Sequence, residues 1–122
     1  TFHPAMRFVG PVRAALGMPC VFNVLGPLTN PASPKHMAVG CANRAMSPIM
    51  AAVYAANGQT GMVYTSSEGL DEMAPTGPVS IWEFSNGKVY VLAGAYLVEE
   101  PVSKGDDATI ELKFEGIKGT WQ

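Results

Sequence analysis

Two groups of side chains in this sequence could bind a ligand, and the first lies near the beginning of the chain. His3 and Arg13 are ten positions apart in a segment with helical periodicity. A helical rise of about 1.5 Å per residue would place them about 15 Å apart along one wall. An arginine can grip a carboxylate with two parallel hydrogen bonds, and a histidine can donate to the same ligand or stack on an aromatic ring. Spacing alone favours the plainer alternative, a solvated Arg13 and a terminal His3.

The second group is the acidic run Glu68-Gly69-Leu70-Asp71-Glu72, which follows a predicted parallel strand. Ligands in open α/β sheets gather at the carboxyl ends of the strands. Magnesium usually takes one or two protein carboxylates and completes its shell with water and substrate phosphates. Asp71 and Glu72 are therefore candidate magnesium ligands. The alternative is a solvated acidic loop, or a helix N-terminus that favours negative charge.

Several motifs of other enzyme classes are missing from the sequence. It has no glycine-rich phosphate loop with a lysine, no dinucleotide fingerprint, no Gly-x-Ser-x-Gly elbow and no His-Glu-x-x-His helix. Cys20 and Cys41 have neither the number nor the spacing of a zinc site, so we expect two reduced, buried thiols. The residues supply parts of a site rather than a complete one.

Composition indicates one globular core without a polyanionic partner. The 122 residues are 48% hydrophobic and 15% charged, with a net charge of −2 and no cluster of basic residues. This balance disfavours nucleic acid and anionic membranes. No stretch approaches the roughly 18 consecutive apolar residues of a membrane span. The first residue is Thr1 and an organised motif follows at once, which indicates a piece of a longer chain.

A helix over residues 4–17 must position the first group, with Pro4 in its first turn and Gly17 as its stop. Pro11 predicts a kink or a break into two short helices. The two sides of this helix differ in character. The apolar side holds Ala5, Phe8, Val9, Val12, Ala15 and Leu16, and the other side holds His3, Met6, Gly10 and Arg13.

A strand, helix and strand must position the acidic run. Residues 20–25 form a short apolar run, and residues 26–31 predict a structured loop. A strand over 36–42 is followed by a helix that Ser47 caps and that ends near Asn57-Gly58, and then by a strand over 61–65. This order predicts a βαβ unit with parallel strands and a right-handed crossover.

An antiparallel pair follows the parallel unit. Residues 79–84 and 88–92 flank Ser85-Asn86-Gly87, which is a hairpin signal. Alternation over residues 110–115 predicts one last half-buried strand. The predicted fold is an α/β, three-layer domain with a mixed, mainly parallel sheet.

Three motifs resemble a known family. They are His3-Pro4-Ala5-Met6-Arg7 with Pro11-Val12-Arg13, the block Phe22-Asn23-Val24-Leu25-Gly26-Pro27-Leu28-Thr29-Asn30-Pro31, and Gly69-Leu70-Asp71-Glu72. Over about residues 1–92 the sequence closely resembles anthranilate phosphoribosyltransferases. The resemblance implies that residues 1–122 are part of the C-terminal α/β domain, with a nucleoside phosphorylase/phosphoribosyltransferase-like fold. Residues from about 93 onward match the family poorly, and this tail is an insertion, a divergent strand or a foreign ending.

The family transfers the phosphoribosyl group of phosphoribosyl pyrophosphate to the amine of anthranilate, a step of tryptophan biosynthesis, with Mg²⁺. By resemblance, His3, Met6 and Arg13 map onto the anthranilate-binding helix, where Arg13 meets the carboxylate. Asp71 and Glu72 map onto the magnesium-binding pair. The complete protein is expected to be a cytoplasmic homodimer that uses no covalent nucleophile, and no catalytic residue is assigned here. The family's phosphate-binding loops precede this region, so the piece alone is expected to be inactive.

Three alternatives remain open. A pyrimidine nucleoside phosphorylase shares the architecture but should lack a carboxylate-gripping arginine on the first helix. A catalytically silent relative that binds nucleic acid would need a basic groove, which the net charge of −2 disfavours. A structural fragment without activity of its own would expose apolar surface.

Overall fold

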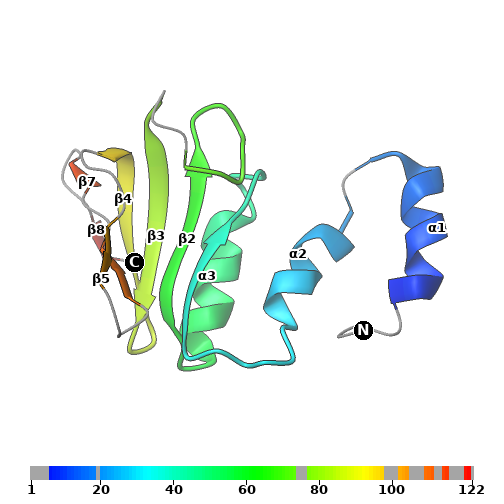
Figure 1. Cartoon of the computed structure of the whole chain (residues 1–122), viewed down its shortest axis with the longest axis horizontal. Coiled ribbons are helices and arrows are strands. Elements are labelled where there is room, and N and C mark those ends of the chain that lie inside the picture. Colours follow the sequence, from blue (N-terminus) through cyan, green and yellow to red (C-terminus); the bar gives the residue numbers. More distant parts are fainter. Residues whose placement is uncertain are drawn as a thin grey trace. The chain divides into compact units, whose positions relative to one another are not determined.

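A computed structural model describes residues 6–18, 20–73, 77–97, 102–104, 109–111, 114–115 and 120–121 (Figure 1). Two compact units follow one another along the chain, residues 1–34 and residues 35–122. The first unit holds helices α1 and α2, and the second holds α3 and all the described strands. None of the helices in the described part of the chain is long and apolar enough to span a bilayer.

Helix α1 spans Met6–Leu16 and runs through Pro11 without a break, so the predicted alternative of two short helices is wrong. Pro11 removes one backbone hydrogen bond, which the rest of the helix tolerates. Gly17 ends α1 as predicted, with a φ of 60° and an N–H that donates to the Arg13 carbonyl at 3.3 Å. Residues 4 and 5, where the helix was predicted to begin, lie outside the described residues.

Helix α2 spans Phe22–Leu28 and corrects the prediction for residues 26–31. Gly26, Pro27 and Leu28 form the last turn of this helix instead of a loop. The turn closes at Thr29, whose N–H and Oγ1 both donate to the Leu25 carbonyl, at 2.9 and 2.7 Å. These two bonds offset the one that Pro27 cannot make.

The second unit begins with the predicted βαβ arrangement. Strand β1 (His36–Gly40) pairs in parallel with β2 (Thr60–Ser66), and α3 (Ser47–Ala56) connects them. The Asn-Gly hairpin is also confirmed, because β3 (Val79–Ser85) and β4 (Lys88–Leu97) pair antiparallel. Asn86 and Gly87 have positive φ angles of 51° and 74°, the geometry of a tight two-residue turn.

Four short strands follow: β5 (Val102–Lys104), β6 (Thr109–Glu111), β7 (Phe114–Glu115) and β8 (Thr120–Trp121). Strands β7 and β8 pair with β4, whereas β5 and β6 pair with each other. The single strand predicted over residues 110–115 is therefore wrong, since β6 and β7 belong to different sheets.

The fold class is α/β with a mixed sheet, as predicted. The order is β1-β2-β3-β4-β7, with β8 also beside β4. Among the described strands only β1 and β2 pair in parallel, so the pairing is mainly antiparallel where the sequence predicted mainly parallel. The hairpin and the tail strands account for the difference. Helix α3 lies against one face of the sheet (Figure 1).

The core of the second unit lies between α3 and the sheet. Tyr54 of α3 stacks on Phe84 of β3, with ring centroids 5.2 Å apart and an interplanar angle of 25°. The Tyr54 hydroxyl is buried and has no hydrogen-bond partner among the described residues. Burial, and to a smaller extent Cys41, raises the pKa of this hydroxyl. On the opposite face, a second cluster is formed by Val79, Ile81 and Ala95, with Met62, Tyr64, Met73 and Leu92 packed against it.

Candidate functional site

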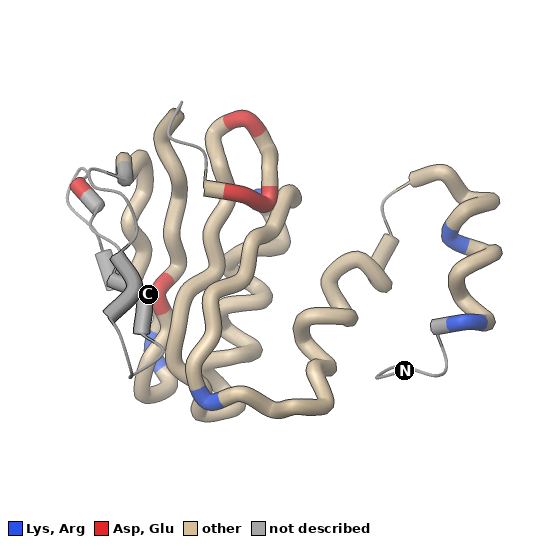
Figure 2. The backbone as a smooth tube through the Cα atoms, in the orientation of Figure 1, with Lys and Arg blue, Asp and Glu red and all other residues tan. Residues whose placement is uncertain are grey.

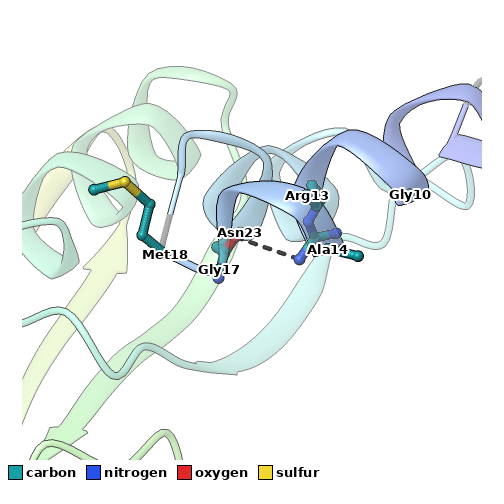
Figure 3. A pocket seen from close by; sticks show the side chains of 6 residues that line it. All are labelled: Gly10, Arg13, Ala14, Gly17, Met18 and Asn23. Atoms are coloured by element: carbon teal, nitrogen blue, oxygen red, sulfur yellow. Dashed lines mark hydrogen bonds between the residues drawn. The ribbon is translucent and has the colours of Figure 1, made fainter.

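Arg13 lies in the last turn of α1, where it is half-buried. It lines a shallow pocket of about 440 Å³ within the first unit, shown in Figure 3. The other lining residues are Gly10, Ala14, Gly17, Met18 and Asn23. Small side chains on the α1 face leave the Arg13 guanidinium room to meet a ligand. Whether Arg13 meets a ligand or only solvent is not tested by this geometry, so its role stays a prediction.

Asn23, on α2, is the polar neighbour of Arg13 in this pocket. Arg13 Nη2 donates to Asn23 Oδ1 at 3.3 Å (Figure 3). The same oxygen accepts from the Cys20 backbone N–H at 3.4 Å and from Cys20 Sγ at 3.6 Å. Asn23 belongs to the block that resembles the family, and its residue type alone predicts no role. Its place beside Arg13 depends on how α1 and α2 pack, which spacing does not give.

The structure describes less of Met6 and His3, the other two residues predicted to bind the ligand. Met6 is the first residue of α1. It precedes Arg13 by seven positions, or nearly two helical turns, so the two positions lie on the same side of the helix. The Met6 side chain is not described. His3 lies outside the described residues, so its predicted role stays a prediction.

The acidic run forms a loop after β2, and its acidic residues are coloured red on the backbone tube of Figure 2. Ser66 closes the loop: its Oγ accepts from the Leu70 N–H at 2.9 Å, and its N–H donates to the Leu70 carbonyl at 3.1 Å. Gly69 has a φ of 76°, a conformation that favours glycine. Asp71 and Glu72 are exposed, as ligands for a hydrated cation must be.

The backbone of the acidic loop approaches the end of β1 closely, between Asp71 and Gly40. A Cβ atom added to Gly40, at the end of β1, would lie 1.8 Å from the Asp71 carbonyl oxygen. Any side chain at position 40 would displace that backbone. The absence of a side chain at Gly40 therefore lets the acidic loop lie directly over the end of β1.

The charge of this loop affects the pKa of Tyr64 on β2. Burial raises the pKa of its hydroxyl, and the carboxylates of Asp71 and Glu72 raise it further. Both acidic side chains therefore project a negative potential toward the face of the sheet that holds Tyr64. Among the described residues, no group of three or more His, Cys, Asp or Glu side chains could hold a metal ion. Two carboxylates suit Mg²⁺, which takes its other ligands from water and phosphate.

Two buried hydroxyl groups link the end of β2 to Cys41, the residue after β1, and to the first turn of α3. Thr65 Oγ1 donates to the Cys41 carbonyl at 2.7 Å, so its single proton is used there. Ser47 Oγ, 2.6 Å from Thr65 Oγ1, is then the donor in that contact. The prediction that Ser47 caps α3 is wrong, because the helix has no side-chain cap and this hydroxyl is turned into the core. Of the two thiols, Cys41 is buried and Cys20 is only partly buried, and both are free.

Comparison with known proteins gives two family matches. The model described as glycosyl transferase family, a/b domain, matches residues 1–95. The model described as phage tail tube protein matches residues 71–121, so the two overlap over residues 71–95. The end of the first match agrees with the predicted loss of resemblance near residue 93.

Curated relatives agree with the first match. Anthranilate phosphoribosyltransferase from Salinispora arenicola is 52% identical over 88 residues, which are 72% of this chain and 25% of the relative. The enzyme of the same name from Arthrobacter sp. is 49% identical over 88 residues, again 72% and 25%. The chain thus spans about a quarter of the length of the curated relatives that it matches.

Solved structures agree as well. The Saccharomyces cerevisiae anthranilate phosphoribosyltransferase in complex with 4-fluoroanthranilate superposes with a TM-score of 0.63 at 32% identity, covering 73% of this chain and 26% of that one. The complex of the same enzyme with PRPP and Mg has a TM-score of 0.58 at 34% identity, covering 66% and 23%. Because the first model matches 95 of the 122 residues, this chain belongs to the glycosyl transferase family that the α/β-domain model describes.

Proposed function

We propose that this chain is part of an enzyme that transfers the phosphoribosyl group of phosphoribosyl pyrophosphate to anthranilate, in tryptophan biosynthesis. The identity of 52% over 88 residues to the Salinispora arenicola anthranilate phosphoribosyltransferase carries the proposal. The Arg13 pocket adds a chemical reason, since a guanidinium beside small side chains suits an aromatic carboxylate. The chain contributes a quarter of such a protein, so activity requires the remaining portion.

In this proposal α1 supplies the anthranilate site. Arg13 grips the carboxylate, and the family resemblance assigns Met6 and His3 to the same anthranilate site. The reaction as proposed needs no covalent nucleophile from this chain. The contribution of these residues is to position the amine for attack on the ribose.

The acidic loop supplies the cation site. Asp71 and Glu72 would hold Mg²⁺, which when bound neutralises charge on the pyrophosphate leaving group. The loop before them is closed by the bonds between Ser66 and Leu70, and the Asp71 backbone lies against Gly40, which favours a fixed place for the carboxylates. Mg²⁺ in the PRPP complex of the Saccharomyces cerevisiae relative supports the cation, although not these two ligands. We further propose that the complete protein is a cytoplasmic homodimer that binds neither nucleic acid nor membrane, and that residues 1–122 are part of its C-terminal α/β domain.

Complementation tests this function. The chain is mixed with the part of the Salinispora arenicola enzyme that lies outside the aligned region, together with phosphoribosyl pyrophosphate and Mg²⁺. We expect the mixture to consume fluorescent anthranilate while neither piece does so alone. Arg13→Ala, and Asp71→Asn with Glu72→Gln, should abolish consumption, whereas Arg44→Ala and Glu68→Gln should not. A folded mixture without activity would argue against the proposal.

The alternatives from the sequence are weaker on the same observations. A pyrimidine nucleoside phosphorylase would have no use for the carboxylate-binding pocket at Arg13, and uracil or thymine turnover by the mixture would favour it. A nucleic-acid-binding relative would need a basic groove, against the net charge of −2. A fragment without a partner would bind no ligand at all.

A second function is favoured by the match of residues 71–121 to the phage tail tube protein family. This segment contains β3 to β8, which pair with one another only antiparallel. We propose as the alternative that these strands form a β-sheet module that associates with further copies of the chain. Light scattering and electron microscopy of the chain decide between the two. Rings or tubes would favour assembly, and a monomer that complements the transferase would exclude it.

A further inference from the structure

Asn23 Oδ1 is the shared acceptor for three donors that come from two parts of the first unit. Arg13 Nη2 reaches it from the last turn of α1, at 3.3 Å. Cys20 reaches it with its backbone N–H and with its thiol, at 3.4 and 3.6 Å. One amide oxygen therefore ties the end of α1 to the beginning of α2 at the wall of the Arg13 pocket (Figure 3).

Asn23, the hydrogen-bond partner of Arg13, is an uncharged amide. A carboxylate beside Arg13 would cancel the guanidinium charge and compete with an anionic ligand. The amide oxygen orients the guanidinium and leaves its charge in place. Arg13 forms no ion pair with an acidic side chain in the described part of the chain, and the bond to Asn23 uses one of its five N–H donors. The remaining donors can still meet a carboxylate in pairs.

We propose that Asn23 is a positioning residue for the carboxylate of the acceptor substrate. It holds the Arg13 guanidinium in the pocket and, being neutral, keeps that guanidinium available to an anion. This inference rests on the proposed function for the identity of the ligand. The contact between Asn23 and Arg13 can be tested without any ligand.

The first measurement is the mobility of the Arg13 side chain in the 122-residue chain, from ¹⁵N relaxation of its Nε–H group. Asn23→Ala should lower the order parameter of this group. Asn30→Ala is the matched control, because Asn30 Oδ1 accepts from the Ala32 N–H at 3.0 Å and does not contact Arg13. Equal order parameters for Arg13 in the wild type and in Asn23→Ala would overturn the inference.

The second measurement compares the dissociation constants of anthranilate and anthranilamide, which differ in the carboxylate. A charge-assisted pair predicts that the wild-type chain prefers anthranilate about tenfold or more. Asn23→Ala should reduce this preference by several-fold. Aspartate has nearly the same shape as asparagine, and Asn23→Asp should remove the preference, because the new carboxylate at this position would pair with Arg13 in place of the ligand carboxylate. A merely structural role for Asn23 would weaken both ligands equally, and that result would overturn the inference.

The two measurements separate the inference from the function on which it rests. A wild-type chain that binds both ligands equally would overturn the proposed anthranilate site. If Arg13 were still more mobile in Asn23→Ala, that result would support Asn23 as the group that positions Arg13. Circular dichroism of each variant shows whether α1 and α2 remain folded.

Discussion

Tyr64 gives a direct readout of the charge on Asp71 and Glu72, because these carboxylates raise the pKa of its hydroxyl above that expected from burial alone. We predict that Asp71→Asn with Glu72→Gln lowers the Tyr64 pKa toward the ordinary value of 10.0. Mg²⁺ held by the two carboxylates should lower it in the wild type. Tyrosinate absorbance during a pH titration, with Tyr64→Phe subtracted, measures the shift. Glu68→Gln is the control and should change nothing.

The same pKa fixes the sign of an alkaline effect on stability. The Tyr64 phenol binds its proton more tightly in the folded chain than in the unfolded chain. Its contribution to the free energy of unfolding is fully present below the unfolded value near 10.0 and is lost as the pH rises through the raised, folded value. The double variant should therefore lose less stability than the wild type as the pH rises above 10.0.

Residue types predicted the candidate carboxylate-binding and cation-binding side chains, but not the neighbouring groups that contact them. Arg13, Asp71 and Glu72 stand out because their side chains are charged and lie in motifs. Asn23, Ser66 and Gly40 act through contacts between segments that are 10, 4 and 31 positions apart. Only the short Ser66 contact lies within the reach of local sequence patterns, as a serine before a turn.

At the scale of elements, the hydroxyl chain from Ser47 through Thr65 joins the beginning of α3 to the ends of β1 and β2. We predict that Thr65→Val lowers the free energy of unfolding by about 1–3 kcal/mol, because the Cys41 carbonyl loses its donor and the Ser47 hydroxyl keeps only the Asn43 carbonyl, at 3.4 Å. Denaturant unfolding followed by Trp82 fluorescence measures this. Ser47→Ala should lower the free energy of unfolding less in the Thr65→Val variant than in the wild type. Equal losses in the two backgrounds would show that the two hydroxyls are not coupled.

The approach of the acidic loop to β1 depends on Gly40. We predict that Gly40→Ala moves the backbone at Asp71 and destabilises the second unit by about 1–3 kcal/mol, as overpacking does. Amide chemical shifts of Asp71 and Glu72 report the movement. Gly26→Ala is the matched control, since a Cβ there meets nothing within 4 Å. Unchanged shifts in Gly40→Ala would mean that the loop does not rest on β1.

Elements with strong local signals were predicted correctly, and those decided by tertiary contacts were not. The βαβ unit and the Asn86-Gly87 turn follow from periodicity and from residues that favour a positive φ. The end of α2 was missed because Gly26 and Pro27 ordinarily stop a helix, and two bonds from Thr29 offset that tendency here. Ser47 was misread because its hydroxyl prefers Thr65 to the helix end. The sheet was expected to be mainly parallel because the partners of the tail strands could not be read from the sequence.

At the scale of the whole molecule, the described residues of the first unit form no core of their own. Among residues 7–18 and 20–34 none is buried. Phe8, Val12 and Leu16 form one stripe along α1 and are 68%, 57% and 53% exposed. Three large apolar side chains at this spacing favour burial against a partner surface. The aligned residues are about a quarter of each relative, so the remaining portion of such a protein is the partner we expect.

We therefore predict opposite effects of the variant Phe8→Ser with Val12→Ser on the isolated chain and on the complemented enzyme. Alone, the variant should bind less hydrophobic dye and aggregate less, because it exposes less apolar surface. Mixed with the remaining part of the Salinispora arenicola enzyme, it should consume anthranilate much more slowly than the wild-type chain, since the stripe can no longer be buried. Ile49→Ser, at a side chain that is 53% exposed on α3 of the second unit, is the control. Full activity of the Phe8→Ser, Val12→Ser mixture would mean that α1 positions Arg13 without docking through this stripe.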